Sequence, residues 1–289
     1  MKLSWSNFSL DFSEKTYIMG VLNVTPDSFS DSGLHLDKST AVRRALQMVE
    51  EGADIIDIGG ESTRPGSGPV AGEEELRRTI PVIEALAKKI TVPLSIDTCK
   101  SEVARRALDA GASIVNDISG LRFDTQMARV VSEEKVPVVI MHIKGRPRDM
   151  QKNPAYEALI PEIMDYLRGG IRLALESGVP EDRIIIDPGV GFGKTFEHNL
   201  EIIHNLYEFT LLEKPLLIGP SRKAFTGSAL GGVPPEKRLE GTAAAVAISI
   251  MNGANMVRVH DVKEMVKVAK VADAIKRMKM PNERIKEKT

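Results

Sequence analysis

An alternation of short apolar runs with helix-like segments limits how this chain can fold more than any other feature. Apolar runs rich in β-branched residues occupy residues 17–22, 55–58, 94–96, 114–115, 138–141, 184–186, 216–218 and 256–259. The helix-like segments that follow them occupy residues 38–51, 72–89, 101–110, 125–134, 157–177, 197–207, 239–252 and 262–279. Eight such units predict an α/β fold, a (β/α)8 TIM barrel, which typically takes about 250 residues.

An open doubly wound sheet is the alternative, but it usually has fewer strands and a recognisable nucleotide-binding turn. The glycine-rich segment 187–195 fails both phosphate-loop patterns, because Pro188 and Lys194 stand where glycines are required. No linker or shift in composition divides the chain, so residues 1–289 are predicted to form a single domain. Residues 1–16 predict a β-hairpin that caps the barrel floor, and residues 281–289 a charged, solvated tail.

Composition narrows the class of protein. A chain that is 42% hydrophobic and 27% charged has the balance of a soluble globular protein, and a net charge of -1 gives no reason to expect a nucleic-acid partner. The single Cys99 cannot form an internal disulfide, which is typical of a reducing cytoplasm. The apolar stretch 243–251 is far shorter than the roughly 18 residues of a membrane span. We therefore expect a cytoplasmic protein with no signal peptide and no membrane or nucleic-acid partner.

Polar side chains stand at or near the ends of the predicted strands. They are Asn23, Asp57, Asp97, Asn116, His142, Asp187, Lys223, Arg258 and His260. The C-terminal ends of barrel strands meet on one face, where active sites of this fold lie. A capping role explains one such residue, but it does not explain why all eight strands end this way.

The set divides by charge into two groups. Asp97, Asn116 and Asp187 offer acceptors and an amide, and buried carboxylates need donors, so these residues suit the N–H edge of a flat heterocycle. The second group consists of Asn23, Arg64, Lys223, Arg258 and His260. It suits an anion, and the Asn23 oxygen can bind a Mg2+ that phosphates and water also hold. The substrate is thus expected to join a heterocycle to a phosphorylated group.

Two long loops accompany these groups, at residues 24–37 and 61–71. Loops of about a dozen residues without secondary structure are usually functional or disordered. Both loops carry prolines and polar side chains, so we interpret them as lids that exclude water.

Five motifs resemble those of the dihydropteroate synthases, a family of pterin-binding barrels. They are IMGVLNVTPDSFS at 18–30, DIGGESTRPG at 57–66, DPGVGFGK at 187–194, SRK at 221–223 and RVH at 258–260. The resemblance extends from about residue 17 to 274. It implies a transferase of folate biosynthesis that condenses 6-hydroxymethyl-7,8-dihydropterin pyrophosphate with p-aminobenzoate, uses Mg2+, is a sulfonamide target and forms a homodimer through its late helices.

The resemblance also implies roles for residues of this sequence. Pterin-binding residues would be Asp97, Asn116, Met141, Asp187, Gly219, Lys223 and Arg258. Pyrophosphate-binding residues would be Asn23, Thr63, Arg64, Arg258 and His260, which together with Lys223 are the implied catalytic set, and Asn23 would be the metal ligand. Residues around p-aminobenzoate would be Phe29, Pro65, Phe192 and Lys223. One departure is Ala224, which stands where many members have a serine, so a hydroxyl that could help bind the p-aminobenzoate carboxylate is missing.

Two other functions remain open at this stage. A pterin-binding methyltransferase barrel shares the logic of Asp97, Asn116 and Asp187, but it has no need of the cations that suit pyrophosphate. A catalytically silent paralogue predicts broken loops or a lost Lys223, and the sequence has neither. For the synthase, p-aminobenzoate is a weak nucleophile and no residue of the set is an obvious base. The sequence therefore favours an SN1-like reaction in which pyrophosphate leaves first.

Overall fold

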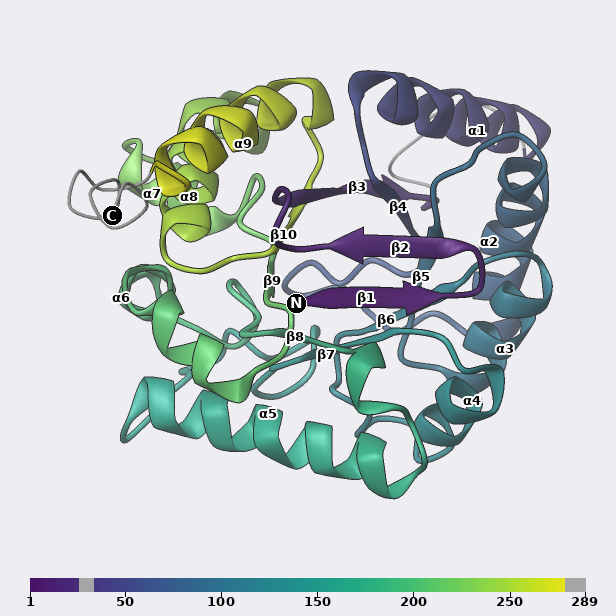
Figure 1. Cartoon of the computed structure of the whole chain (residues 1–289), viewed down its shortest axis with the longest axis horizontal. Helices are drawn as coiled ribbons and strands as arrows, with labels where there is room; N and C mark the ends of the chain where they lie inside the picture. The colour runs from purple at the N-terminus through teal and green to yellow at the C-terminus, as the bar shows by residue number, and fades with distance from the viewer. Residues whose placement is uncertain (26–33, 279–289) are drawn as a thin grey trace, which may run out of the picture.

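The predicted barrel is confirmed. The computed structural model describes residues 1–25 and 34–278, and in that part of the chain eight strands form one parallel sheet in the order β8-β7-β6-β5-β4-β3-β10-β9. The strands are β3 (Tyr17–Asn23), β4 (Ile55–Gly59), β5 (Leu94–Asp97), β6 (Ile114–Asp117), β7 (Val138–Met141), β8 (Ile184–Asp187), β9 (Leu217–Ile218) and β10 (Met256–Val259). A parallel bridge between Ile186 and Leu216 links the two edges, so the sheet closes on itself (Figure 1).

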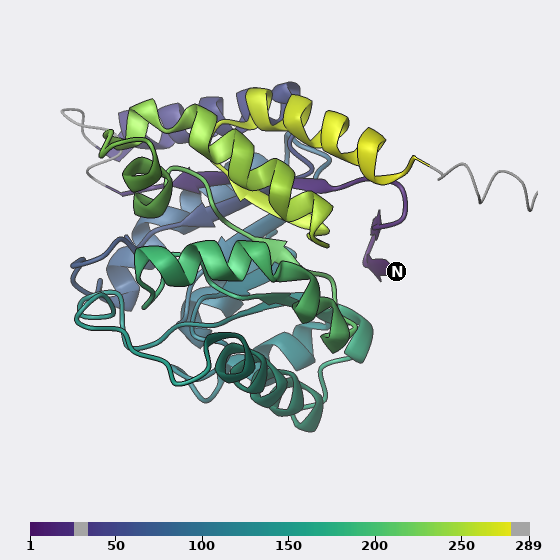
Figure 2. The same ribbon diagram turned by 90° about the vertical axis from the view of Figure 1, so that its left-hand side faces the viewer.

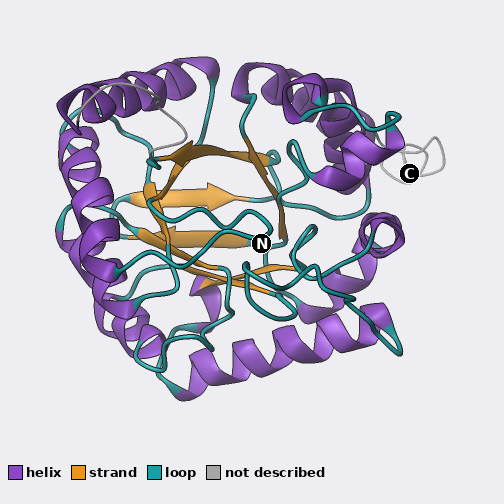
Figure 3. Ribbon diagram, turned by 180° about the vertical axis from the view of Figure 1, so that it is seen from behind, coloured by secondary structure: helices purple, strands orange, loops and turns teal. Residues whose placement is uncertain are grey.

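Helices surround the barrel on the outside (Figure 3). Those that were predicted are α1 (Leu34–Glu51), α2 (Gly72–Ala87), α3 (Ser101–Asp109), α4 (Met127–Glu134), α5 (Leu159–Glu176), α6 (Phe196–His204), α8 (Leu239–Met251) and α9 (Val262–Lys276). Short elements that were not predicted are η2 (Glu181–Arg183), η3 (Leu206–Leu212), α7 (Ala224–Ala229) and η4 (Pro235–Lys237). These are too short for a periodic pattern to reveal them.

Several predicted boundaries differ from the structure. The first helix begins at Leu34, four residues before the predicted start. The helix predicted at 197–207 ends at His204, where the Asn252 side chain donates to the carbonyls of Ile203 and His204 at 2.8 and 3.1 Å. The last helix ends at Lys276, while residue 279 and the tail 281–289 lie outside the described residues.

Both faces of the barrel strands are buried, which explains their continuous apolar composition. Successive residues of a strand point to opposite sides. Ile18 and Ile56 pack outward in the main core beneath the helices, whereas their neighbours Met19 and Ile55 pack inside the barrel. No helix of the described chain is long and apolar enough to cross a membrane.

The predicted N-terminal hairpin is also confirmed and closes one end of the barrel. Strands β1 (Lys2–Trp5) and β2 (Phe8–Asp11) pair antiparallel and lie across the end that faces the viewer in Figure 1 and lies to the right in Figure 2. Leu3 and Trp5 are buried against inward residues at the starts of the barrel strands, Met19 and Met256 among them. The hairpin thus seals the floor, and the opposite, C-terminal end is left for the site.

Candidate active site

Two adjoining cavities open at the C-terminal end of the barrel. The larger has a volume of about 590 Å³ and the smaller about 20 Å³. Gly219, Lys223 and Arg258 line both of them. Because these three residues stand between the cavities, a single elongated substrate could extend across both.

The smaller cavity is lined by carboxylates and by apolar side chains. Asp97, Asn116, Met141, Asp187 and Phe192 are among its lining residues. Asp97 and Asp187 end their strands, and Asn116 lies one residue before the end of β6. The structure therefore places side by side the residues that the sequence assigned to the heterocycle.

A buried ion-pair network connects these groups, and Asp57 is at its centre. One Asp57 oxygen, Oδ2, accepts from Arg258 Nε at 2.6 Å and from Asn116 Nδ2 at 3.0 Å. Arg258 Nη2 donates to Asp97 Oδ2 at 2.7 Å. The sequence placed Asp57 at this face but gave it no role; its contact with Arg258 depends on two strands that are far apart in sequence.

Two carboxylate oxygens in this network need a donor. Within the described residues, Oδ1 of Asp57 and Oδ1 of Asp97 are buried and have no hydrogen-bond partner. Leaving such an acceptor unpaired costs about 1–3 kcal/mol. A ligand that presents N–H groups would relieve that cost at Asp97, which lines the cavity.

Burial shifts the titration of the charged groups here. Burial raises the pKa of Asp97 to about 7, with help from Asp57 and despite the nearby Arg258. Burial likewise raises the pKa of Asp187 to about 6, although the Gly189 amide donates to its Oδ1 at 2.7 Å. Burial and Arg258 lower the pKa of Lys223 to about 8. Perturbed groups of this kind, gathered in a cleft, are typical of functional sites.

The loop after β8 comes unusually close to its neighbours. A Cβ atom on Gly189 would lie 2.0 Å from the carbonyl oxygen of His142, and its φ of +68° is one that glycine tolerates best. On Gly191 a Cβ would lie 2.9 Å from the Lys223 side chain. Phe192 follows, and the Lys223 ammonium lies 4.1 Å from the centre of its ring. The glycines thus let this loop pack directly against the lysine.

A buried lysine holds the same loop and was missed from the sequence. In the sequence Lys194 stands where the dinucleotide-binding pattern requires a glycine, and it ends the DPGVGFGK motif without an assigned role. Its Nζ lies 2.8 Å from His142 Nδ1 and donates to the Phe192 carbonyl at 2.9 Å. Burial and nearby cations lower the pKa of Lys194 well below its ordinary value, and burial with Lys194 lowers the pKa of His142 to about 2. The pair ties the loop to the end of β7.

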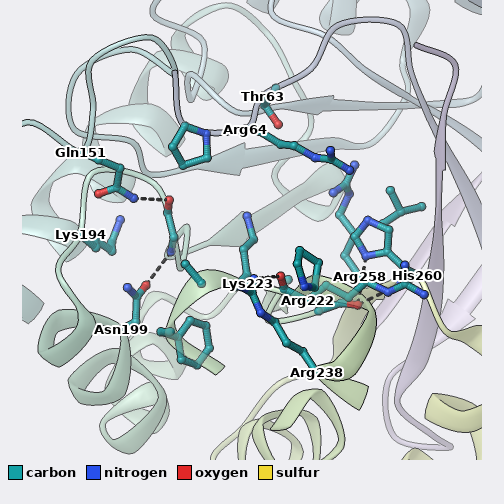
Figure 4. A pocket seen from close by; sticks show the side chains of 18 of the residues that line it. Thr63, Arg64, Gln151, Lys194, Asn199, Arg222, Lys223, Arg238, Arg258 and His260 are labelled. Carbon is teal, nitrogen blue, oxygen red and sulfur yellow. Dashed lines mark hydrogen bonds between the residues drawn. The ribbon is translucent and has the colours of Figure 1, made fainter. Parts of the chain in front are cut away.

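The larger cavity carries the cations expected to bind an anion. Figure 4 shows Thr63, Arg64, Arg258 and His260 around it, from two separate parts of the chain. Asn23, at the end of β3, and Pro65 also line it. The lid at 61–71 therefore lies over this cavity.

His260 is held in place by Ser221, which the sequence placed in a motif but gave no role. The Ser221 hydroxyl lies 3.1 Å from His260 Nδ1 and accepts from its backbone N–H at the same distance. Burial, together with Arg258 and Arg222, lowers the pKa of His260 to about 3. The imidazole is therefore neutral near pH 7 and acts as a hydrogen-bond partner rather than as a cation.

Two residues that the sequence associated with p-aminobenzoate are Phe29 and Ala224. Phe29 and most of the first lid lie in residues 26–33, outside the described residues. Ala224 is exposed at the larger cavity and begins α7, with Lys223 as the capping residue. The described chain therefore offers Pro65, Phe192 and Lys223 of the residues expected around p-aminobenzoate.

The chain is similar in sequence to proteins of known function. The family model described as pterin binding enzyme matches residues 19–260. The dihydropteroate synthase of Synechocystis is 48% identical over 265 residues, covering 92% of this chain and 92% of its own. The chain therefore belongs to the pterin-binding enzymes.

Two solved structures extend the likeness. The Clostridium difficile dihydropteroate synthase, solved in the presence of pteroic acid, is 46% identical with a TM-score of 0.88, covering 93% of this chain and 100% of its own. The Xanthomonas albilineans dihydropteroate synthase, solved with 4-aminobenzoic acid, is 41% identical with a TM-score of 0.90, covering 96% and 99%. Within its family the chain belongs to the dihydropteroate synthases, which makes it a transferase.

Proposed function

We propose that this dihydropteroate synthase condenses 6-hydroxymethyl-7,8-dihydropterin pyrophosphate with p-aminobenzoate in its two joined cavities, by an SN1-like course. The observation that carries the proposal is the junction at Lys223 and Arg258, which joins a carboxylate-lined cavity to a cation-lined one. A pterin edge suits the first and a pyrophosphate the second. The ligands named for the solved relatives, pteroic acid and 4-aminobenzoic acid, support this pairing.

The pterin would lie with its N–H edge on Asp97, Asn116 and Asp187. Asp97 brings a buried acceptor without a partner in the described chain, and the edge supplies donors. Lys223 and Gly219 would border the ring, with Met141 beneath it and Arg258 above. Hydrogen bonds to charged groups such as these carboxylates are worth about 1.5–3 kcal/mol each, so they would contribute strongly to binding of the pterin edge.

Departure of pyrophosphate would be the difficult step. Breaking the C–O bond transfers negative charge to the leaving group, and Arg64, Arg258 and the neutral His260 are placed to stabilise it. Thr63 and Asn23 would add hydrogen bonds. The electron-rich dihydropterin ring stabilises the cation that remains, and the lids keep water from it.

The arylamine then adds to the cation, and the proton lost from its nitrogen passes to the departed pyrophosphate. Pro65, Phe192 and the Lys223 stem would border its ring, together with Phe29. Within the described residues no aspartate or glutamate lines the larger cavity, and His260 is engaged with Ser221. The described lining thus lacks a carboxylate base for the amine, which suits a reaction in which the amine needs no activation.

A Mg2+ ion is compatible with the larger cavity as a companion of the substrate. In the described chain no group of three acidic, histidine or cysteine side chains could hold a metal alone. Mg2+ is commonly held by one or two protein oxygens together with substrate phosphates. The Asn23 amide oxygen is the group that would hold it, and the ion would neutralise charge on the pyrophosphate.

The protein is further proposed to work as a cytoplasmic homodimer. Neighbouring late elements α6, α8 and α9 expose apolar side chains: Leu200, Ile248, Val271 and Ile275. Such side chains favour association of two copies through these helices. Sedimentation equilibrium tests this; a monomer at micromolar concentration would exclude it, and Ile248→Glu should weaken a dimer.

Pyrophosphate release tests the proposed function. Purified enzyme with Mg2+, the pterin pyrophosphate and p-aminobenzoate should release pyrophosphate and form 7,8-dihydropteroate in equal amounts. A pterin-binding methyltransferase would release none. Absence of both products from folded enzyme would rule the proposal out.

A further inference from the structure

A long segment between β7 and α5, residues 142–158, links the second lid to the loop after β8. It spans 17 positions without helix or strand, a length that is usually functional in a compact domain. Of its residues, the sequence pattern singles out His142 at the end of β7 and the family resemblance assigns a role to none. We propose that this segment is a fixed wall of the arylamine site, and that Met150 and Gln151 are specificity-determining residues on it.

The segment is braced so that it can serve as a wall. Backbone bonds within it run from Asp149 and Met150 to the Arg146 carbonyl at 3.0 and 2.7 Å. The Arg146 amide in turn donates to the Asp149 side chain at 3.1 Å. A second tie comes from Tyr156, whose hydroxyl donates to the Gly193 carbonyl at 2.7 Å. The bonds around Arg146 fold residues 146–150 into a compact turn, and the Tyr156 bond attaches the end of the segment to the loop after β8.

The wall makes contact with the lid and with the glycine loop at the same time. Gly66, at the tip of the second lid, donates its amide to the Pro147 carbonyl at 3.0 Å. Gln151 Nε2 donates to the Gly191 carbonyl at 2.9 Å, as Figure 4 shows. The segment therefore sets the distance between Pro65, next to the tip, and Phe192, next to Gly191. Both side chains are among those expected to border the arylamine ring.

Met150 fills the space behind the gap between Pro65 and Phe192. It is 3% exposed and packs in one apolar cluster with Met141, Ile143 and Phe192. It also lines the larger cavity together with Thr63 and Pro65. A residue that touches both the pterin-side cluster and the larger cavity limits how wide an arylamine can be.

The wall rests on the proposed function, and the experiment distinguishes a failure of the wall from a failure of that function. Wild-type enzyme and Met150→Ala are compared with p-aminobenzoate and with 4-amino-3-methylbenzoate, whose ring is wider by one methyl group. The ratio of kcat/KM for the methylated amine to that for p-aminobenzoate should rise at least tenfold in Met150→Ala. Met150→Leu, which nearly conserves volume, should keep the wild-type ratio. A ratio within twofold of wild type in Met150→Ala would overturn the assignment.

Met141→Ala is the matched comparison, because Met141 belongs to the same cluster but lines the smaller cavity. It should raise the KM for the pterin substrate and leave the arylamine ratio unchanged. A change of the ratio equal to that of Met150→Ala would mean general loosening and count against the wall. If wild type turned over neither amine, the proposed function would fail. Calorimetric measurement of the affinities for the two amines would then test the proposed wall independently of turnover.

Gln151 gives a second test that does not depend on a buried substitution. Gln151→Leu removes the bond to Gly191 and should raise the KM for p-aminobenzoate about tenfold. Its kcat and the Kd for the pterin substrate should stay within twofold, a split that a general loss of structure would not give. Gln126→Leu, exposed before α4 and lining neither cavity, is the control and should change nothing. Equal changes in the KM for p-aminobenzoate and in the Kd for the pterin substrate would refute a positioning role for Gln151.

Discussion

Arg258 donates from Nη2 to Asp97 Oδ2 at 2.7 Å, so the guanidinium occupies one oxygen of the carboxylate expected to bind the pterin. The other oxygen, Oδ1, is buried and has no hydrogen-bond partner in the described chain, which leaves it to accept from a pterin N–H group. A second bond, from Arg258 Nε to the fully buried Asp57 at 2.6 Å, holds the arginine in place beside Asp97.

Asp187→Asn should largely abolish pterin binding. The substituted amide carries no charge and presents an N–H group toward donors of the ligand, so a charge-assisted bond is replaced by a clash of donors. The loss is expected to be about 1.5–3 kcal/mol or more, roughly ten- to a hundredfold or greater in Kd. Calorimetry with a pterin analogue measures it. An affinity within about twofold of wild type would remove Asp187 from the site.

Pterin affinity should fall as the solution becomes acidic. Donors on the ligand favour ionised carboxylates, and the pKa values of Asp97 and Asp187 are raised to about 7 and 6. Below pH 7 binding must therefore release protons, and the association constant should fall by up to tenfold per pH unit for each group. The stability of the folded protein should change with pH in the opposite direction to pterin affinity. Raised carboxyl pKa values in the folded state penalise folding above pH 7, and this penalty is relieved as pH falls toward 4.

Calorimetry and thermal unfolding between pH 5 and 8 check both signs. Asp187→Asn should remove the contribution of that group to the unfolding curve and leave the contribution of Asp97. A wild-type affinity that stays flat across this range would contradict the raised pKa values as determinants of binding.

The barrel and most strand-end residues were predictable because they follow from local pattern. A buried parallel strand is marked by its β-branched run, and Asp97 or Asp187 is the next polar residue. The hairpin 1–16 was predictable for the same reason. The short helix α7 was missed, since six residues around Gly227 carry no period.

What the sequence could not reveal are contacts between segments that only the closed barrel brings together. Asp57 meets Arg258 across β4 and β10, and Lys194 meets His142 across β8 and β7. Met150 lies in an aperiodic segment, so nothing local shows that it is buried. Its proximity to Phe192 depends on the order of strands.

Lys194→Met should destabilise the protein by about 1–3 kcal/mol, because it leaves the Phe192 carbonyl and His142 Nδ1 without their donor in a buried place. The matched control is Lys214→Met, since Lys214 is similarly buried but pairs with the exposed Glu181, where about 1 kcal/mol or less is expected. Urea unfolding measures both. Equal urea midpoints for the two variants would show that the contacts of Lys194 stabilise the protein no more than the pair of Lys214 with Glu181.

Turnover should require Mg2+. The leaving pyrophosphate carries several charges, and Asn23, which lines the larger cavity, offers an amide oxygen suited to this ion. Enzyme treated with EDTA should lose its activity and regain it on addition of Mg2+, with unchanged thermal unfolding as the control for folding. Full activity in EDTA would exclude a metal requirement.

The order of bond changes is the last prediction. If pyrophosphate leaves before the amine attacks, the enzyme and its pterin substrate alone should form a transient cation and pyrophosphate under the lids. An 18O label placed in the bridging position should then move into the non-bridging positions as pyrophosphate returns. Arg64→Ala should slow this exchange, since it removes a cation from the departing group, whereas the control Arg129→Ala on the exposed face of α4 should not. Phosphorus NMR of the recovered substrate measures the exchange. A label that stays in place, together with a rate that rises steeply with amine nucleophilicity, would establish direct displacement instead.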